Sequence, residues 1–263
     1  MDLLLSQINT GQLAWAFGVT LAAAYFHGLL GLGFVSVAMP LLVLFIDLRT
    51  AMVVTVPPAF FLSARLAFFG GGLKQSLGRH WFMPLFMMIG GVSGAWLFQT
   101  LPQQALLMII VLVLILFLSI DTLKKSHVHL PKPWVMPAAA FFAFLAGNTE
   151  TSINMGAPFL LVFFLIAGYA PNLIVQVINL CFFSGKVVHV ITLSIGGAAN
   201  AAVTLPEWIP GLIMAPVCIW LCNFGVRKRE RTPVETYRRW LKGFLSALVL
   251  VLLGKLALGL WPM

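Results

Sequence analysis

Long apolar segments separated by short polar ones dominate this chain. The segment from Ala105 to Ile120 contains no charged residue at all. Runs of about 20 apolar residues are long enough for a helix that crosses a lipid bilayer. The strict alternation of a β-barrel is absent, so we predict an all-α, polytopic helical membrane protein. The ten predicted segments are residues 12–28, 35–47, 50–69, 81–99, 104–122, 134–147, 153–168, 172–195, 206–226 and 237–260.

The first two segments, and likewise the sixth and seventh, are shorter than ordinary spans. Each pair therefore forms either two short crossings or one re-entrant hairpin. Either way each half of the chain makes an odd number of crossings, five or three, so the second half lies upside down relative to the first. We predict one membrane domain over residues 1–263, with inverted repeats at 12–122 and 134–260 and a cytoplasmic linker at 123–133.

An interrupted pattern recurs in the two repeats at a distance of about 118 residues. The first interruption contains Gly28, Gly31 and Gly33 and precedes Pro40, while the second runs from Gly147 to Ser152 and precedes Pro158. After a three-residue difference in length the register resumes, and Arg65 aligns with Lys186. In the first repeat, Pro57 and Pro58 are expected to kink their helix. Paired interruptions at matching positions of two halves point to a transport site.

The composition supports a membrane location and excludes other classes. The chain is 61% hydrophobic and 9% charged, and its net charge is +9. Short basic loops between spans mark the cytoplasmic side, so the charge predicts topology rather than nucleic-acid binding, with both termini on the outer face of a cell inner membrane. Twelve of the sixteen Lys and Arg lie in three clusters: Lys74 and Arg79; Lys124, Lys125 and Lys132; and Arg227, Lys228, Arg229, Arg231, Arg238, Arg239 and Lys242.

Two cations lie inside predicted spans. A charge near the middle of a bilayer costs at least about 2.5–3.5 kcal/mol, so it normally faces a cavity or a partner. Arg65 and Lys186 are therefore predicted as counter-charges for an anionic substrate. The alternative is that both side chains extend to the membrane interface. Arg65 is nearer to the end of its segment, so this alternative fits Arg65 better than Lys186.

The interruptions themselves supply a second set of candidates. Glycines permit a tight turn and let a ligand approach the backbone, which applies to Gly31 and Gly33. Side-chain oxygens that cap a short helix leave its positive end free to face an anion. The candidates for such caps are Ser36, Thr151, Ser152 and Asn154. The alternative is that the small residues only let helices pack closely.

Glu150 is an acid within a segment predicted at membrane depth. It either carries coupling protons or pairs with Lys186 or Arg65, or it is solvated because the interruption opens to the cytoplasm. His27 and His189 are further candidates for proton handling, and Gln176 and Asn179 would donate hydrogen bonds to an oxyanion. No motif of a catalytic domain, cofactor or metal site occurs, so we expect neither an enzyme nor a cofactor or metal requirement.

The segment from Gly28 to Leu42 and its counterpart ending at Gly156-Ala157-Pro158-Phe159-Leu160 resemble the TauE/SafE family of sulfite and sulfonate exporters. The resemblance covers nearly the whole chain. It implies passage of a small sulfur-containing anion such as sulfite, sulfoacetate or another sulfonate, coupled to an ion gradient, with export the expected direction.

The resulting hypothesis is a secondary transporter whose substrate binds near the midplane, at the interface between the repeats. Its predicted partners are the small anion and the lipid bilayer. The oligomeric state stays open, with a homodimer as one arrangement. The alternative is an ion channel or metal-cation permease lined by Glu150 and the histidines. Binding of a divalent cation, or conductance without saturation, would favour that alternative.

Overall fold

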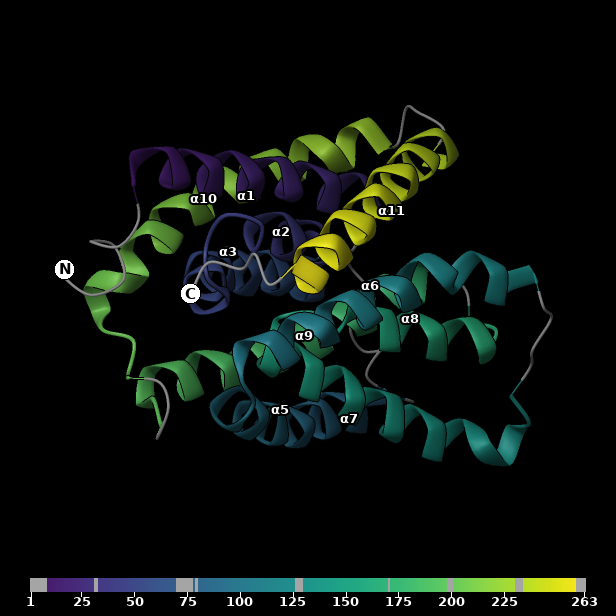
Figure 1. The fold of residues 1–263 in the computed structure, drawn as a ribbon. Coiled ribbons are helices and arrows are strands. Elements are labelled where there is room, and N and C mark those ends of the chain that lie inside the picture. Colours follow the sequence, from purple (N-terminus) through teal and green to yellow (C-terminus); the bar gives the residue numbers. More distant parts are fainter. Residues whose placement is uncertain are drawn as a thin grey trace.

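The computed structural model describes residues 9–30, 33–69, 78, 80–125, 130–169, 171–197, 201–229 and 234–258, and these residues form helices and connections without any strand (Figure 1). The helices are α1 (Thr10–Leu30), α2 (Phe34–Leu42), α3 (Leu48–Phe69), α5 (Phe82–Thr100), α6 (Gln103–Lys125), α7 (Val135–Ile153), α8 (Ala157–Ile166), α9 (Pro171–Ile195), α10 (Leu205–Arg229) and α11 (Val234–Leu258), with a single 3₁₀ turn, η1 (Lys132–Trp134), before α7.

The all-helical prediction is confirmed. Each of the ten predicted apolar segments falls on one of these helices. Within the described ranges, five helices are long and apolar enough to cross a membrane, namely α3, α5, α6, α9 and α10. Helices α2 and α8 are much shorter, with 9 and 10 residues. Parts of the predicted basic loops, residues 70–77 and 230–233 among them, lie outside the described residues.

The position of the second interruption differs from the prediction. Residues Gly147 to Ser152 are part of α7, and the chain leaves the helix only at Asn154. Two hydroxyl groups in this polar run donate to carbonyls of their own helix, Thr149 Oγ1 to Leu145 (2.9 Å) and Ser152 Oγ to Asn148 (2.8 Å). Such bonds make a polar run compatible with a continuous helix. The prediction that this run breaks the helix is therefore wrong.

Three pairs of helices in the two halves begin at the same spacing. Helix α8 begins 123 residues after α2 (Phe34 to Ala157), and α9 begins 123 residues after α3 (Leu48 to Pro171). Helix α10 likewise begins 123 residues after α5 (Phe82 to Leu205). The packing follows the same pairing, because α5 packs on α7 and α9 while α10 packs on α1 and α3. In Figure 1 the pair α1 and α10 lies at the top and the pair α5 and α7 at the bottom.

Glycines bring the backbones of these helix pairs into contact. A Cβ atom at Gly28 in α1 would lie 2.0 Å from the Cys222 carbonyl oxygen of α10. One at Gly147 in α7 would lie 1.9 Å from the Met87 carbonyl oxygen of α5. Small residues at helix crossings permit such an approach. Gly28 and Gly147, predicted as helix breaks, therefore lie inside α1 and α7 and serve their packing.

Candidate functional site

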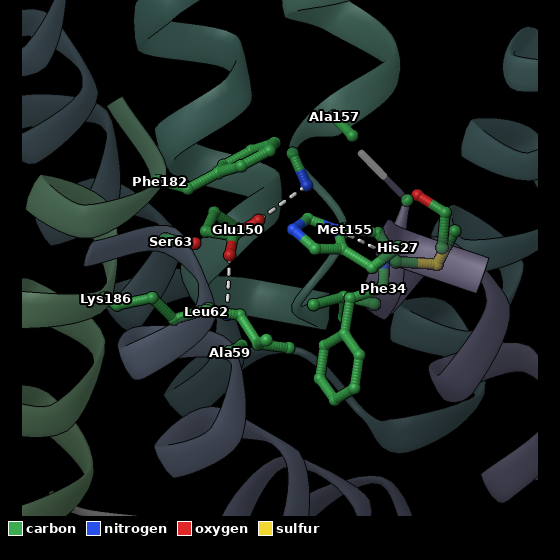
Figure 2. A pocket seen from close by; sticks show the side chains of 14 residues that line it. His27, Phe34, Ala59, Leu62, Ser63, Glu150, Met155, Ala157, Phe182 and Lys186 are labelled. Atoms are coloured by element: carbon green, nitrogen blue, oxygen red, sulfur yellow. Dashed lines mark hydrogen bonds and ion pairs between the residues drawn. The ribbon is translucent and has the colours of Figure 1, made fainter. Parts of the chain in front are cut away.

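A small pocket lies where the two halves meet. Its volume is about 20 Å³, which is room for about one water molecule. Figure 2 shows that His27 and Glu150 both point into its middle. The lining residues come from α1, α2, α3, α7, α8, α9 and the connections that precede α2 and α8: His27, Gly33, Phe34, Val35, Ser36, Ala59, Leu62, Ser63, Glu150, Met155, Gly156, Ala157, Phe182 and Lys186.

A buried ion pair forms the polar centre of this pocket. Lys186 Nζ in α9 lies 2.5 Å from Glu150 Oε1 in α7, and the two side chains are only 1% and 2% exposed. The other carboxylate oxygen, Oε2, accepts the backbone N–H of Gly156 at 2.8 Å. A charge removed from solvent is stabilised only by a partner and further hydrogen bonds. Both oxygens of Glu150 meet this requirement, so the sequence's suggestion of pairing between Glu150 and Lys186 agrees with the geometry.

The ion pair continues into a hydrogen-bond chain that joins the halves. Lys186 Nζ also donates to Asn154 Oδ1, and Asn154 Nδ2 donates to Thr55 Oγ1 of α3 at 2.8 Å. The Thr55 hydroxyl in turn donates to the Ala51 carbonyl at 2.7 Å. Thr55 and Asn154 have no exposed surface. The position of the ammonium group is therefore fixed from both halves of the chain.

Backbone N–H groups at the N-termini of the two short helices donate to side chains of the preceding long helices. The Phe34 N–H at the start of α2 donates to His27 Nδ1 at 3.3 Å, and the Gly156 N–H before α8 donates to Glu150 Oε2. Neither N-cap, Gly33 or Gly156, forms a side-chain cap. The predicted caps are therefore wrong, because the acceptors come from residues six or seven positions earlier. Ser36 lies inside α2, Thr151 and Ser152 lie in the last turn of α7, and Asn154 ends α7.

Several predicted residues lie outside the pocket lining. Arg65 is partly exposed, and its guanidinium lies over the Phe69 ring at 5.2 Å from the centroid. Gln176 Nε2 donates to the Ala67 carbonyl, and Asn179 Nδ2 donates to a carbonyl of its own helix. His189 is fully buried in α9, one turn beyond Lys186, and its ring nitrogens have no hydrogen-bond partner among the described residues. Gly31 lies outside the described residues.

The predicted prolines lie at different places in their helices. Pro40 is inside α2, whereas Pro158 is in the first turn of α8. Pro57 and Pro58 lie inside α3 without ending it. A proline in the first turn needs no acceptor, because it has no N–H to satisfy. The two motif prolines are thus not structurally equivalent.

Ser63 is a pocket residue that the sequence analysis did not propose. It lies on α3 and precedes Lys186 by 123 residues, the spacing at which the helices themselves repeat. By the same spacing His27 corresponds to Glu150, and both line the pocket. The signal was present in the sequence as a serine and a histidine at membrane depth. An alignment of the repeats on Pro40 and Pro158 misses this correspondence, because it does not set Ser63 against Lys186.

Asn154 provides a test of how the site is built. Its backbone is left-handed, with φ 60° and ψ 32°. We expect Asn154→Gly to lose the hydrogen bonds to Lys186 and Thr55 while keeping this backbone conformation. Asn154→Ala should lower the free energy of unfolding by about a further 1 kcal/mol, because a side chain with Cβ disfavours the left-handed region. Thermal unfolding of both variants in detergent measures this order. An alanine variant more stable than the glycine variant would contradict it.

Within the described residues, no three His, Cys, Asp or Glu side chains lie together in a way that would hold a metal ion. A family model described as "Sulfite exporter TauE/SafE" matches residues 16–252. No curated protein and no solved structure gives a significant match to the chain.

Proposed function

We propose a transport function for this chain from one premise, which is that the chain belongs to the sulfite exporter TauE/SafE family. Membership makes it a multi-pass membrane transporter, consistent with its apolar helices. We infer that it is a secondary transporter of a small sulfur-containing anion, such as sulfite, sulfoacetate or another sulfonate. Coupling to an ion gradient, export, and an inner-membrane location with both termini outside belong to the same proposal.

The observation that carries this proposal is the buried ammonium of Lys186 beside the start of α8. A lysine that is 1% exposed inside a membrane helix bundle faces a partner or a substrate path. The Glu150 carboxylate bridges this ammonium and the Gly156 N–H, which sets the positive end of the α8 dipole beside Lys186. A compact oxyanion would find an ammonium, a backbone donor and the hydroxyls of Ser36 and Ser63 around it.

The position of the pocket between the two halves supports alternating access as the mechanism. Its walls come from both halves, and the α3–α9 contact joins those halves beside it. Rocking of one inverted repeat against the other would expose such a site to each side of the membrane in turn. Arg65 is not part of this site, because it stacks on Phe69.

Thermal stability of the purified protein tests the proposal. A ligand that binds only the folded state raises apparent stability by about 2.7 kcal/mol at a concentration of 100 times its Kd. We expect a rise in melting temperature with sulfite, sulfoacetate or isethionate, and none with acetate or divalent cations. The rise should vanish in Lys186→Ala.

Arg65→Ala is the matched control, since it removes a membrane-segment cation outside the pocket. It should keep the anion-dependent rise of the wild-type protein. Stabilisation by divalent cations alone would overturn the proposal in favour of a cation pathway. Loss of the rise in both variants would show that the effect depends on overall charge rather than on this site.

A further inference from the structure

We propose that the Glu150 carboxylate occupies the place of the substrate's anionic group in this conformation, so that each anion is carried together with one proton. This inference rests on the proposed function and adds the coupling ion and its direction relative to the substrate. A substrate that replaces the carboxylate must find it neutral, and neutralisation requires a proton. Anion and proton would then move in the same direction.

The first argument is that Glu150 holds the donors an oxyanion would need. Its Oε1 binds the Lys186 ammonium at 2.5 Å, and its Oε2 binds the Gly156 N–H at 2.8 Å. A sulfonate or sulfite group offers oxygen acceptors of the same kind. The two ligands, one built into the chain and one arriving from solution, therefore compete for the same pair of donors.

Space gives the second argument. The pocket has about 20 Å³, which suits one water molecule and not a sulfur atom with three oxygens. Substrate can enter only if a lining side chain moves. Glu150 is the side chain whose removal also frees the two donors, so its departure from Lys186 is the simplest rearrangement that admits an anion.

Charge gives the third argument. Two anions beside one ammonium would leave a net negative charge at a site with little solvent, which is costly. Transfer of a proton to the carboxylate oxygen that leaves Lys186 removes this cost. The site then holds Lys186 as a cation, Glu150 as a neutral acid and the substrate as the new counter-ion. Its net charge for a monovalent anion is zero, as it is before binding.

Among the described residues, the titratable side chains that line the pocket besides Glu150 are His27 from α1 and Lys186 from α9, and His189 lies one turn beyond Lys186. Helices α5 and α8, which also pack on α7, carry no titratable residue. His27 accepts the Phe34 N–H on Nδ1, so a second ring proton there would break that bond. Lys186 is already a cation in its ion pair, and a proton gained by His189 would place a second cation one helical turn from it, where the two like charges repel. Glu150 is therefore the acceptor of the coupling proton.

The direction of transport then depends on the charge of the substrate. A monovalent sulfonate plus one proton is neutral, so the membrane potential does not act on it, and its export requires an outward substrate gradient that exceeds the inward proton gradient. A divalent anion such as sulfoacetate plus one proton carries one negative charge. A membrane potential, negative inside, contributes about 2.3 kcal/mol per charge per 100 mV and favours its export.

Proteoliposomes with purified wild-type protein test this inference, with isethionate as the probe because its sulfonate stays ionised across the working pH range. We expect a pH gradient to drive isethionate accumulation, and a potassium–valinomycin potential to leave it unchanged. Sulfoacetate should instead respond to the potential. If binding takes up one proton, the apparent affinity for isethionate should fall about tenfold for each unit by which the pH rises.

Glu150→Gln should uncouple the two ions. It imitates the protonated acid, so we expect isethionate counterflow to persist while accumulation driven by the pH gradient is lost. Glu207→Gln is the matched control, because Glu207 is a buried acid of α10 that accepts the Thr204 N–H away from the pocket. It should keep full coupling. The wild-type measurement remains decisive if Glu150→Gln does not fold.

The outcomes separate the inference from the proposed function. Isethionate or sulfoacetate flux without proton movement, or full coupling in Glu150→Gln, would overturn the proton inference and leave the transporter intact. Proton movement opposite to the anion would overturn it as well. Absence of sulfite, sulfoacetate and isethionate flux in wild-type vesicles would overturn the proposed function, and the inference with it.

Discussion

Replacement of Lys186 by alanine is expected to abolish anion transport. The ammonium is buried beside Glu150 and the start of α8, so no solvent or neighbouring cation replaces it in the described pocket. Loss of one member of a buried, hydrogen-bonded charge pair costs about 2–5 kcal/mol, which corresponds to at least about 30-fold in affinity. Uptake of radiolabelled isethionate and sulfite by proteoliposomes measures the loss.

A stability measurement must accompany that experiment, because Lys186 also holds Glu150 and Asn154. The single variant leaves a buried carboxylate without its cation, whereas Lys186→Ala with Glu150→Gln removes both charges. We expect the double variant to be the more stable of the two and equally inactive. Arg65→Ala should transport at the wild-type rate. A stable Lys186→Ala protein with unchanged uptake would exclude an anion site at this position.

The helices were predictable because membrane insertion demands long apolar segments with every backbone group bonded internally. The short helices α2 and α8 follow the same signal, since their segments are apolar but interrupted. The polar run before α8 gave the wrong boundary. The hydroxyl groups of Thr149 and Ser152 bond to their own helix, and the helix ends only where Asn154 adopts a left-handed backbone. Composition alone does not show whether a polar run interrupts a helix or continues it through hydrogen bonds to the helix's own carbonyls.

The central cation of the pocket was predictable, but its partners were only partly so. Lys186 stood out because a charge inside an apolar segment is costly, and Glu150 stood out as an acid at the same depth. Arg65 was paired with Lys186 because the repeats were aligned on Pro40 and Pro158. Pro40 is inside α2 and Pro158 is in the first turn of α8, so that alignment is displaced. The helix starts, 123 residues apart, set Ser63 against Lys186 instead.

Replacement of Gly147 by alanine is expected to destabilise the fold more than any surface change. Its Cβ atom would lie 1.9 Å from the Met87 carbonyl oxygen and 2.9 Å from the Gly91 nitrogen, both backbone atoms of α5. Backbone atoms cannot rotate away, so α5 and α7 must separate. Overpacking of this kind costs about 1–3 kcal/mol and occasionally more. Because α7 carries Glu150, anion binding should fall along with the melting temperature.

The same substitution at Gly18 in α1 makes the sharpest comparison. A Cβ atom there meets nothing within 4 Å, and alanine favours a helix interior over glycine by about 1 kcal/mol. Gly18→Ala should therefore melt at or above the wild-type temperature, while Gly147→Ala melts below it. Helix propensity is equal in the two cases, so the difference between them isolates the contact between α5 and α7. Equal melting temperatures would mean that these helices do not touch at Gly147, and the position of Glu150 would lose its structural basis.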